Sequence, residues 1–217
     1  MAAFDLEEQE QISQIKGWWE QYGKLVTTLA VAAALASVGW QGWNWYKGKQ
    51  VAEASALYDQ LQTAAAEHNA PKVREVAGAL LEKFSGTAYA DLAALLSAKV
   101  QAEAGDLKNA RAPLAWAAEK ASDPALRDLA RLRLASVMLD DKAYDEALAQ
   151  LQTAPDESLA ARFADLKGDI LVAQGKKEEA RAAYKTVVSS LESATKAESV
   201  TLREIAQAKL DAVGGAQ

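Results

Sequence analysis

Cysteine is absent from this 217-residue chain, and histidine occurs once, as His68. A chain without cysteine has no disulfide, no thiolate metal site and no thiol nucleophile. The sequence also has no HExxH pair and no glycine-rich phosphate loop after a strand. We therefore predict no catalytic residues, no metal site and no cofactor, and the chain is not expected to be an enzyme.

Positive charge is also scarce, because 24 Lys and Arg face 30 Asp and Glu, for a net charge of -6. Nucleic-acid binding needs an excess of basic residues on one surface, so we predict no nucleic-acid partner. Proline occurs four times and aromatic residues make up 7% of the chain, while alanine and leucine are abundant. This composition is typical of an all-α protein.

One stretch lacks charge altogether: no Asp, Glu, Lys or Arg lies between Lys24 and Lys47. As a helix, residues 25–46 would span roughly 33 Å, close to the hydrocarbon thickness of a bilayer. Aromatic side chains, which favour the membrane interface, lie on both flanks of this window. The predicted membrane-interface residues are Trp18, Trp19, Tyr22, Trp40, Trp43, Trp45 and Tyr46. The window predicts a single transmembrane helix over residues 25–46.

A cleavable signal peptide is the main alternative, because Ala34 and Ala36 precede Ser37 as in a small-residue cleavage site. The preceding residues 1–24 are long and acidic, unlike a short positive leader. We therefore predict an uncleaved anchor preceded by a short amphipathic segment, residues 1–24. Two lysines on each side of the window leave the orientation open under the positive-inside rule.

The rest of the chain, residues 47–217, contains a repeated plan of turn, polar residues and an alanine that opens a second helix. Ala110, Ala147 and Ala180 occupy the same place after three turns, 37 and 33 residues apart. This is close to the 34-residue tetratricopeptide period. We predict a tetratricopeptide-like α-solenoid that ends in a C-terminal capping helix, with a non-repetitive helical bundle as the alternative.

The whole chain resembles the YfgM family, the ancillary subunit of the bacterial SecYEG translocon. The resemblance is carried by the acidic N-terminus, the run GWWEQYGK at residues 17–24, the run WNWY at residues 43–46 and the repeats. It implies a single-pass protein of the bacterial cell inner membrane, with residues 1–24 cytoplasmic and residues 47–217 periplasmic. It also implies partnership with the SecYEG translocon and with the membrane-anchored periplasmic folding factor PpiD. Secreted client chains would then pass to periplasmic chaperones.

The first helix of each tetratricopeptide pair lines the concave side of the array, where partners usually dock. Aligning the turns predicts eight partner-binding residues in this groove: Leu92, Lys99, Leu129, Ser136, Arg162, Asp165, Asp169 and Val172. Trp116 lies off the close-packed face, and we expect it to pack against a neighbouring helix, with a partner anchor as the alternative.

Three classes of function remain open after this reading. The first is a translocon-associated adaptor, and the second is an envelope signalling regulator that holds a partner through the same repeats. The third is an envelope enzyme, for which the sequence has no reactive constellation.

Overall fold

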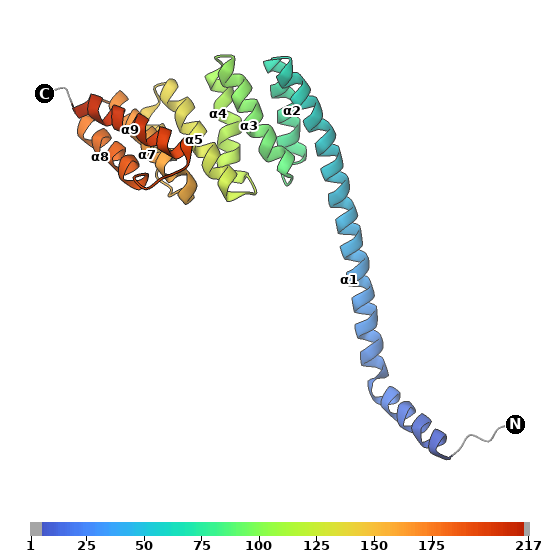
Figure 1. The fold of residues 1–217 in the computed structure, drawn as a ribbon. Coiled ribbons are helices and arrows are strands. Elements are labelled where there is room, and N and C mark those ends of the chain that lie inside the picture. The colour runs from blue at the N-terminus through green and yellow to red at the C-terminus, as the bar shows by residue number, and fades with distance from the viewer. Residues whose placement is uncertain (1–5, 215–217) are drawn as a thin grey trace. The chain divides into compact units, whose positions relative to one another are not determined.

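A computed structural model describes residues 6–214, with side chains from residue 12 onward, and every regular element within these residues is a helix. The ends of the predicted segments 1–24 and 47–217, namely residues 1–5 and 215–217, lie outside this range. Figure 1 shows one long helix followed by a row of shorter ones. The predicted all-α chain with a long apolar N-terminal helix is confirmed.

Contacts divide the chain into two compact units, one up to Gln50 and one from Val51. Helix α1, Leu6–Ala66, runs from the first unit into the second without a loop at Lys24 or Lys47. The boundary between units therefore lies four residues after the predicted end of the transmembrane helix, within a continuous helix.

The second unit consists of helical hairpins in chain order. After the C-terminal part of α1, its helices are α2 (Ala70–Lys83), α3 (Ala88–Glu103), α4 (Leu107–Lys120), α5 (Pro124–Asp140), α6 (Tyr144–Gln150), α7 (Glu157–Ala173), α8 (Lys177–Ser190) and α9 (Ala197–Gly214). Side-chain acceptors cap five of these helices at their first turns, at Asn69, Thr87, Asp106, Asp123 and Asp156. Helix α6 is half as long as α2, α4 and α8, with 7 residues against 14 in each of the others.

The two helices of each hairpin are joined by one turn, and the four turns are equivalent. His68, Gly105, Lys142 and Gly175 all have a left-handed backbone, with φ between 53° and 77°. At each turn the following N–H reaches back to a carbonyl five residues earlier, as in Asp106 to Gln101 at 2.8 Å and Lys176 to Leu171 at 2.9 Å. This is the Schellman motif, which satisfies the last carbonyls of the first helix. The turn at His68 shows that α1 and α2 form a hairpin of the same kind.

Apolar side chains form three clusters along the row of hairpins. The first joins the C-terminal part of α1 to α2 and α3, and includes Leu61, Val73 and Leu80. The largest extends from α3 to α7 around Leu114 and Leu134. The third is small and consists of Leu171, Ala180 and Tyr184, with partly buried residues of α8 and α9 around them. Because each hairpin packs mainly against its neighbours, the core is divided among these clusters along the row and has no single centre.

Buried aspartates connect one hairpin to the next. The N–H of Ser122, just before α5, donates to Asp91 Oδ2 on α3 at 3.0 Å. The N–H of Asp156, just before α7, donates to Asp128 Oδ2 on α5 at 2.9 Å. Asp91 and Asp128 are 1% and 7% exposed. Each carboxylate therefore fixes the point at which the next hairpin begins.

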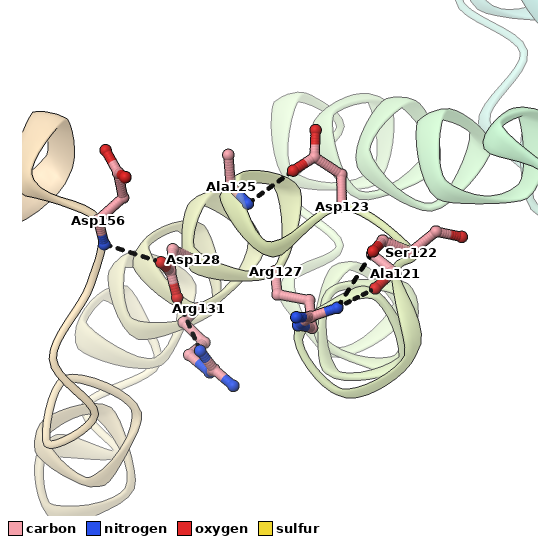
Figure 2. A network of polar contacts seen from close by, with 8 residues as sticks. All are labelled: Ala121, Ser122, Asp123, Ala125, Arg127, Asp128, Arg131 and Asp156. Carbon is pink, nitrogen blue, oxygen red and sulfur yellow. Dashed lines mark hydrogen bonds and ion pairs between the residues drawn. The ribbon is translucent and has the colours of Figure 1, made fainter.

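The two aspartates differ in the partner of their second oxygen. Figure 2 shows Asp128 between the Asp156 backbone and the Arg131 side chain, whose Nη1 donates to Asp128 Oδ1 at 2.7 Å. The residue three positions after Asp91 is Ala94, and Asp91 Oδ1 is buried without a hydrogen-bond partner in the described part of the protein. The α3–α5 junction is thus incompletely satisfied, whereas the α5–α7 junction is closed by an ion pair.

Candidate partner-binding and membrane surfaces

The eight predicted groove residues all lie on the first helices of the hairpins, α3, α5 and α7. On α3, Leu92 is 40% exposed and Lys99 is exposed, forming an ion pair with Glu103 at 3.8 Å. On α5, Ser136 is exposed, while Leu129 is partly buried against the largest apolar cluster. On α7, Val172 is 41% exposed. Four of these five side chains are therefore exposed, two of them aliphatic and two polar.

The three charged groove residues of α7 are in contact with the C-terminal helix α9. Arg162 pairs with Glu198. Lys209 Nζ donates to both oxygens of Asp165, at 3.0 and 2.9 Å, and to Asp169 at 2.8 Å. The structure thus brings Asp165 and Asp169 together around a cation from the same chain, and their side chains are not free to bind a partner while α9 is docked.

Tyr184 of α8 completes this cluster, because its hydroxyl donates to Asp169 Oδ1 at 2.8 Å. Burial and the hydrogen bond to Asp169 raise the pKa of the Tyr184 hydroxyl above its ordinary value. Burial also raises the pKa of Asp165, against the lowering effect of Lys209. Burial lowers the pKa of Lys209, but the hydrogen bonds to Asp169 and Asp165 outweigh it and raise that pKa overall. The ammonium therefore stays charged between the two carboxylates at neutral pH.

The long helix α1 carries the candidate membrane surface. It is the one described helix that is long and apolar enough to cross a membrane, and none of its most apolar stretch is buried. All seven predicted membrane-interface aromatics are exposed, from 43% at Tyr22 to 72% at Trp45. On the N-terminal side the Trp18 ring lies 5.8 Å from the Tyr22 ring, and on the other side Lys47 lies 5.3 Å from the Trp43 ring.

Helix α1 bends in its N-terminal, blue part in Figure 1. Within α1 the Thr27 hydroxyl donates to the Gly23 carbonyl at 2.7 Å, and the Thr28 hydroxyl donates to the Lys24 carbonyl at 2.8 Å. Threonine hydroxyls that bond back to a carbonyl four residues earlier commonly bend helices. The Trp19 ring covers Gly23, where a Cβ would lie 3.1 Å from the indole. A cleft of about 720 Å³ lies beside these residues.

The repeat arrangement and the apolar helix have counterparts in known proteins. A family model described as a tetratricopeptide repeat-like domain matches residues 16–215. A protein named ancillary SecYEG translocon subunit from Haemophilus influenzae is 33% identical over 188 residues, covering 87% of this chain and 92% of that protein. The chain belongs to the ancillary SecYEG translocon subunit family.

Two further proteins of the ancillary SecYEG translocon subunit family carry the same name. The one from Escherichia coli is 31% identical and covers 84% of this chain and 88% of its own length. The one from Neisseria gonorrhoeae is 30% identical and covers 97% of this chain and 99% of its own length. No solved structure gives a significant match. The predicted resemblance and the predicted tetratricopeptide-like solenoid are both confirmed.

Sequence reasoning missed several structural residues of this translocon subunit family member. Lys209 lies 40 and 44 residues from its two partners, too far for a local pattern to reveal the contact. Asp91 lies in the first turn of α3, where negative charge is ordinary, and Asp128 lies just after the first turn of α5. Their separation of 37 residues, equal to that of Ala110 and Ala147, is the signal that identifies them as repeat positions. Trp116, as expected, packs against the largest apolar cluster.

Proposed function

We propose that the chain is a non-enzymatic, single-pass adaptor of the bacterial inner membrane that associates with the SecYEG translocon. The observation that supports this most is the presence, on one chain, of an exposed apolar helix with aromatic flanks and a tetratricopeptide-like array. The names of the relatives supply the translocon as the partner. A helix anchors the chain, and an array of hairpins offers a surface to proteins.

The finer part of the proposal concerns topology and hand-over. Residues 1–24 are cytoplasmic, residues 25–46 cross the membrane, and residues 47–217 lie in the periplasm. There the array binds the membrane-anchored folding factor PpiD and helps pass secreted chains to periplasmic chaperones. If the topology is right, protease added to intact spheroplasts digests residues 47–217. Protection of these residues from the protease would mean that the orientation is opposite to the one proposed.

The proposed binding surface is the open part of the groove: Leu92, Lys99, Leu129, Ser136 and Val172. The aliphatic side chains suit the apolar segments of an unfolded chain. The single lysine, Lys99, suits the backbone carbonyls and acidic groups of that chain. Arg162, Asp165 and Asp169 remain part of the proposed groove, but each is paired with α9.

Affinity purification from detergent-solubilised membranes tests the partners, and crosslinking tests the surface. A chain without cysteine allows single-cysteine crosslinking at chosen sites. Ser136→Cys on α5 and Glu119→Cys on α4 form a matched pair, since both positions are exposed and only the first lies on a first helix. We expect SecYEG, PpiD and secreted chains among the neighbours of position 136. Recovery of a regulatory protein without any translocon subunit would favour the signalling alternative, and equal crosslinking at both positions would reject the groove.

A further inference from the structure

Helix α9 is held in place with little apolar burial. It packs against α8 as α5 packs against α4. Helix α5 has six buried residues, whereas Ala206 alone is buried in α9, all of whose residues the structure describes. Leu210 and Val213 add only partly buried contacts to the smallest apolar cluster. Two equivalent positions in the array therefore differ greatly in hydrophobic attachment.

The seam between α8 and α9 is also open to solvent. Two surface clefts of about 360 and 490 Å³ lie along it, and Val188 and Arg203 line both. Water therefore reaches the side chains on this side of α9.

Charges supply most of the specific contacts of α9. Lys209 lies between Asp165 and Asp169, and Glu198 pairs with Arg162. Arg203 donates to the carbonyl of Glu192 in the α8–α9 connection at 2.9 Å. The Lys209 side chain is 30% exposed, so water and salt reach this contact. Segments attached in this way open at a lower free energy than the core of the same protein.

We propose that α9 is an exchangeable occupant of the α7–α8 surface, and that a partner helix carrying a lysine at the place of Lys209 docks there instead. The proposal rests on the proposed function, because it makes the end of the array part of the partner-binding surface. Charge complementarity selects the occupant. Asp165 and Asp169 converge on one ammonium, and Tyr184 orients Asp169, so a helix without a cation at that place leaves two adjacent carboxylates unpaired.

A peptide of residues 197–214, labelled with a fluorophore and added in trans, tests the exchange on the full chain in detergent. The Lys209→Ala chain has a weakened α9 of its own, so the native peptide competes well with it. We expect the peptide to bind this variant at least ~10-fold more tightly than wild type, whose own α9 is present at high effective concentration. Equal binding to both chains, or no binding to the variant, overturns the proposal.

The role of the lysine is tested with a matched peptide and a matched site. The peptide carrying Lys209→Ala is expected to bind the Lys209→Ala chain ~10-fold more weakly than the native peptide, because it lacks the charge-assisted hydrogen bonds. Adding Asp165→Asn and Asp169→Asn to the chain is expected to abolish that preference. A preference that survives both substitutions shows that the carboxylates are not the docking site.

Hydrogen exchange on the wild-type chain supplies an independent measurement. We expect the α9 amides to exchange faster than those of α5 and to accelerate several-fold between 0.05 and 0.5 M salt, over which the screening length falls from about 14 to 4 Å. Exchange of α9 only through global unfolding overturns the proposal. The two proposals fail separately: absence of the translocon from purified material counts against the function, while peptide exchange is independent of it.

Discussion

In the α3–α4 hairpin Ala98 and Leu114 are buried in one apolar cluster, whereas in the α7–α8 hairpin the equivalent positions hold Gly168 and Tyr184. Both pairs lie seven residues before and nine residues after the turn glycine, at Gly105 and Gly175. A Cβ on Gly168 would lie 2.3 Å from the Tyr184 ring. The comparison teaches that the two positions are coupled: a large aromatic residue on the second helix requires glycine, which has no side chain, on the first.

The largest effect is expected from Gly168→Ala, which gives the last hairpin the small residue of the α3–α4 hairpin without its leucine. The Tyr184 ring has little freedom to move, because its hydroxyl is bonded to Asp169. We expect a loss of about 3 kcal/mol in the free energy of unfolding, at the upper end for overpacking. Urea unfolding followed by circular dichroism measures it.

The matched control for Gly168→Ala completes the exchange of the two hairpins. Adding Tyr184→Leu to Gly168→Ala reproduces the pair of the α3–α4 hairpin and should recover at least half of the loss. Substitutions in contact are expected to be strongly non-additive in this way. Additive effects would show that the backbones of the two hairpins differ and that the comparison is wrong.

The second largest effect is expected from Asp128→Ala, which opens the α5–α7 junction. The substitution leaves the Asp156 N–H and the Arg131 guanidinium without their acceptor. We expect a loss of about 2 kcal/mol, because removing one partner of a buried polar contact costs the desolvation of the other. Thermal unfolding checks the magnitude. A wild-type melting temperature would mean that this carboxylate is not structural.

A smaller effect, of opposite sign, is expected at the turn of the α5–α6 hairpin. Lys142 has φ 61°, in the left-handed region where a side chain is strained, and Gly105 and Gly175 occupy the same place in their hairpins. Lys142→Gly should raise the free energy of unfolding by about 0.5 to 1 kcal/mol, because relief of strain exceeds the added flexibility of the unfolded chain. Gly105→Ala serves as the reverse control and should destabilise by a similar amount. Chemical denaturation compares the pair.

The smallest effect is expected from Asp91→Asn at the α3–α5 junction. The amide oxygen still accepts from Ser122, and no cation loses its partner, since Ala94 stands where Arg131 stands in the next junction. We expect a change within about 0.5 kcal/mol. Asp128→Asn should cost more in the same assay. Equal costs for the two substitutions would remove the distinction between the junctions.

Much of this fold was predictable from sequence, because turns and small residues have local signatures. Gly105 and Gly175 mark their turns directly, and Ala110, Ala147 and Ala180 set the period. The turn at His68 was harder to recognise because a non-glycine residue holds the left-handed conformation there. Leu151, which follows Lys142 by nine residues as Leu114 follows Gly105, is not in a helix, since α6 ends at Gln150.

The candidate groove was predictable in its location on the first helices but not in its accessibility. Leu92 and Lys99 are seven residues apart on α3, so the helical period alone places both side chains on the same exposed face of that helix. The state of Asp165 and Asp169 depends on Lys209, which reaches them only after two further helices have folded. Lys209 lies in the C-terminal helix, outside the repeated turns, so the period of the repeats does not reveal its contacts.

The short helix α6 has a consequence for how the array unfolds. With 7 residues it offers half the packing length of the other second helices, and α5 and α7 contact each other directly beside it. In a linear array, cooperativity passes only between neighbours, so a short member by itself would divide the chain into blocks. The largest apolar cluster runs from α3 to α7 past this helix, so the direct α5–α7 contact supplies the coupling for which α6 is too short. Weakening that contact is expected to split the single unfolding transition of the array into two.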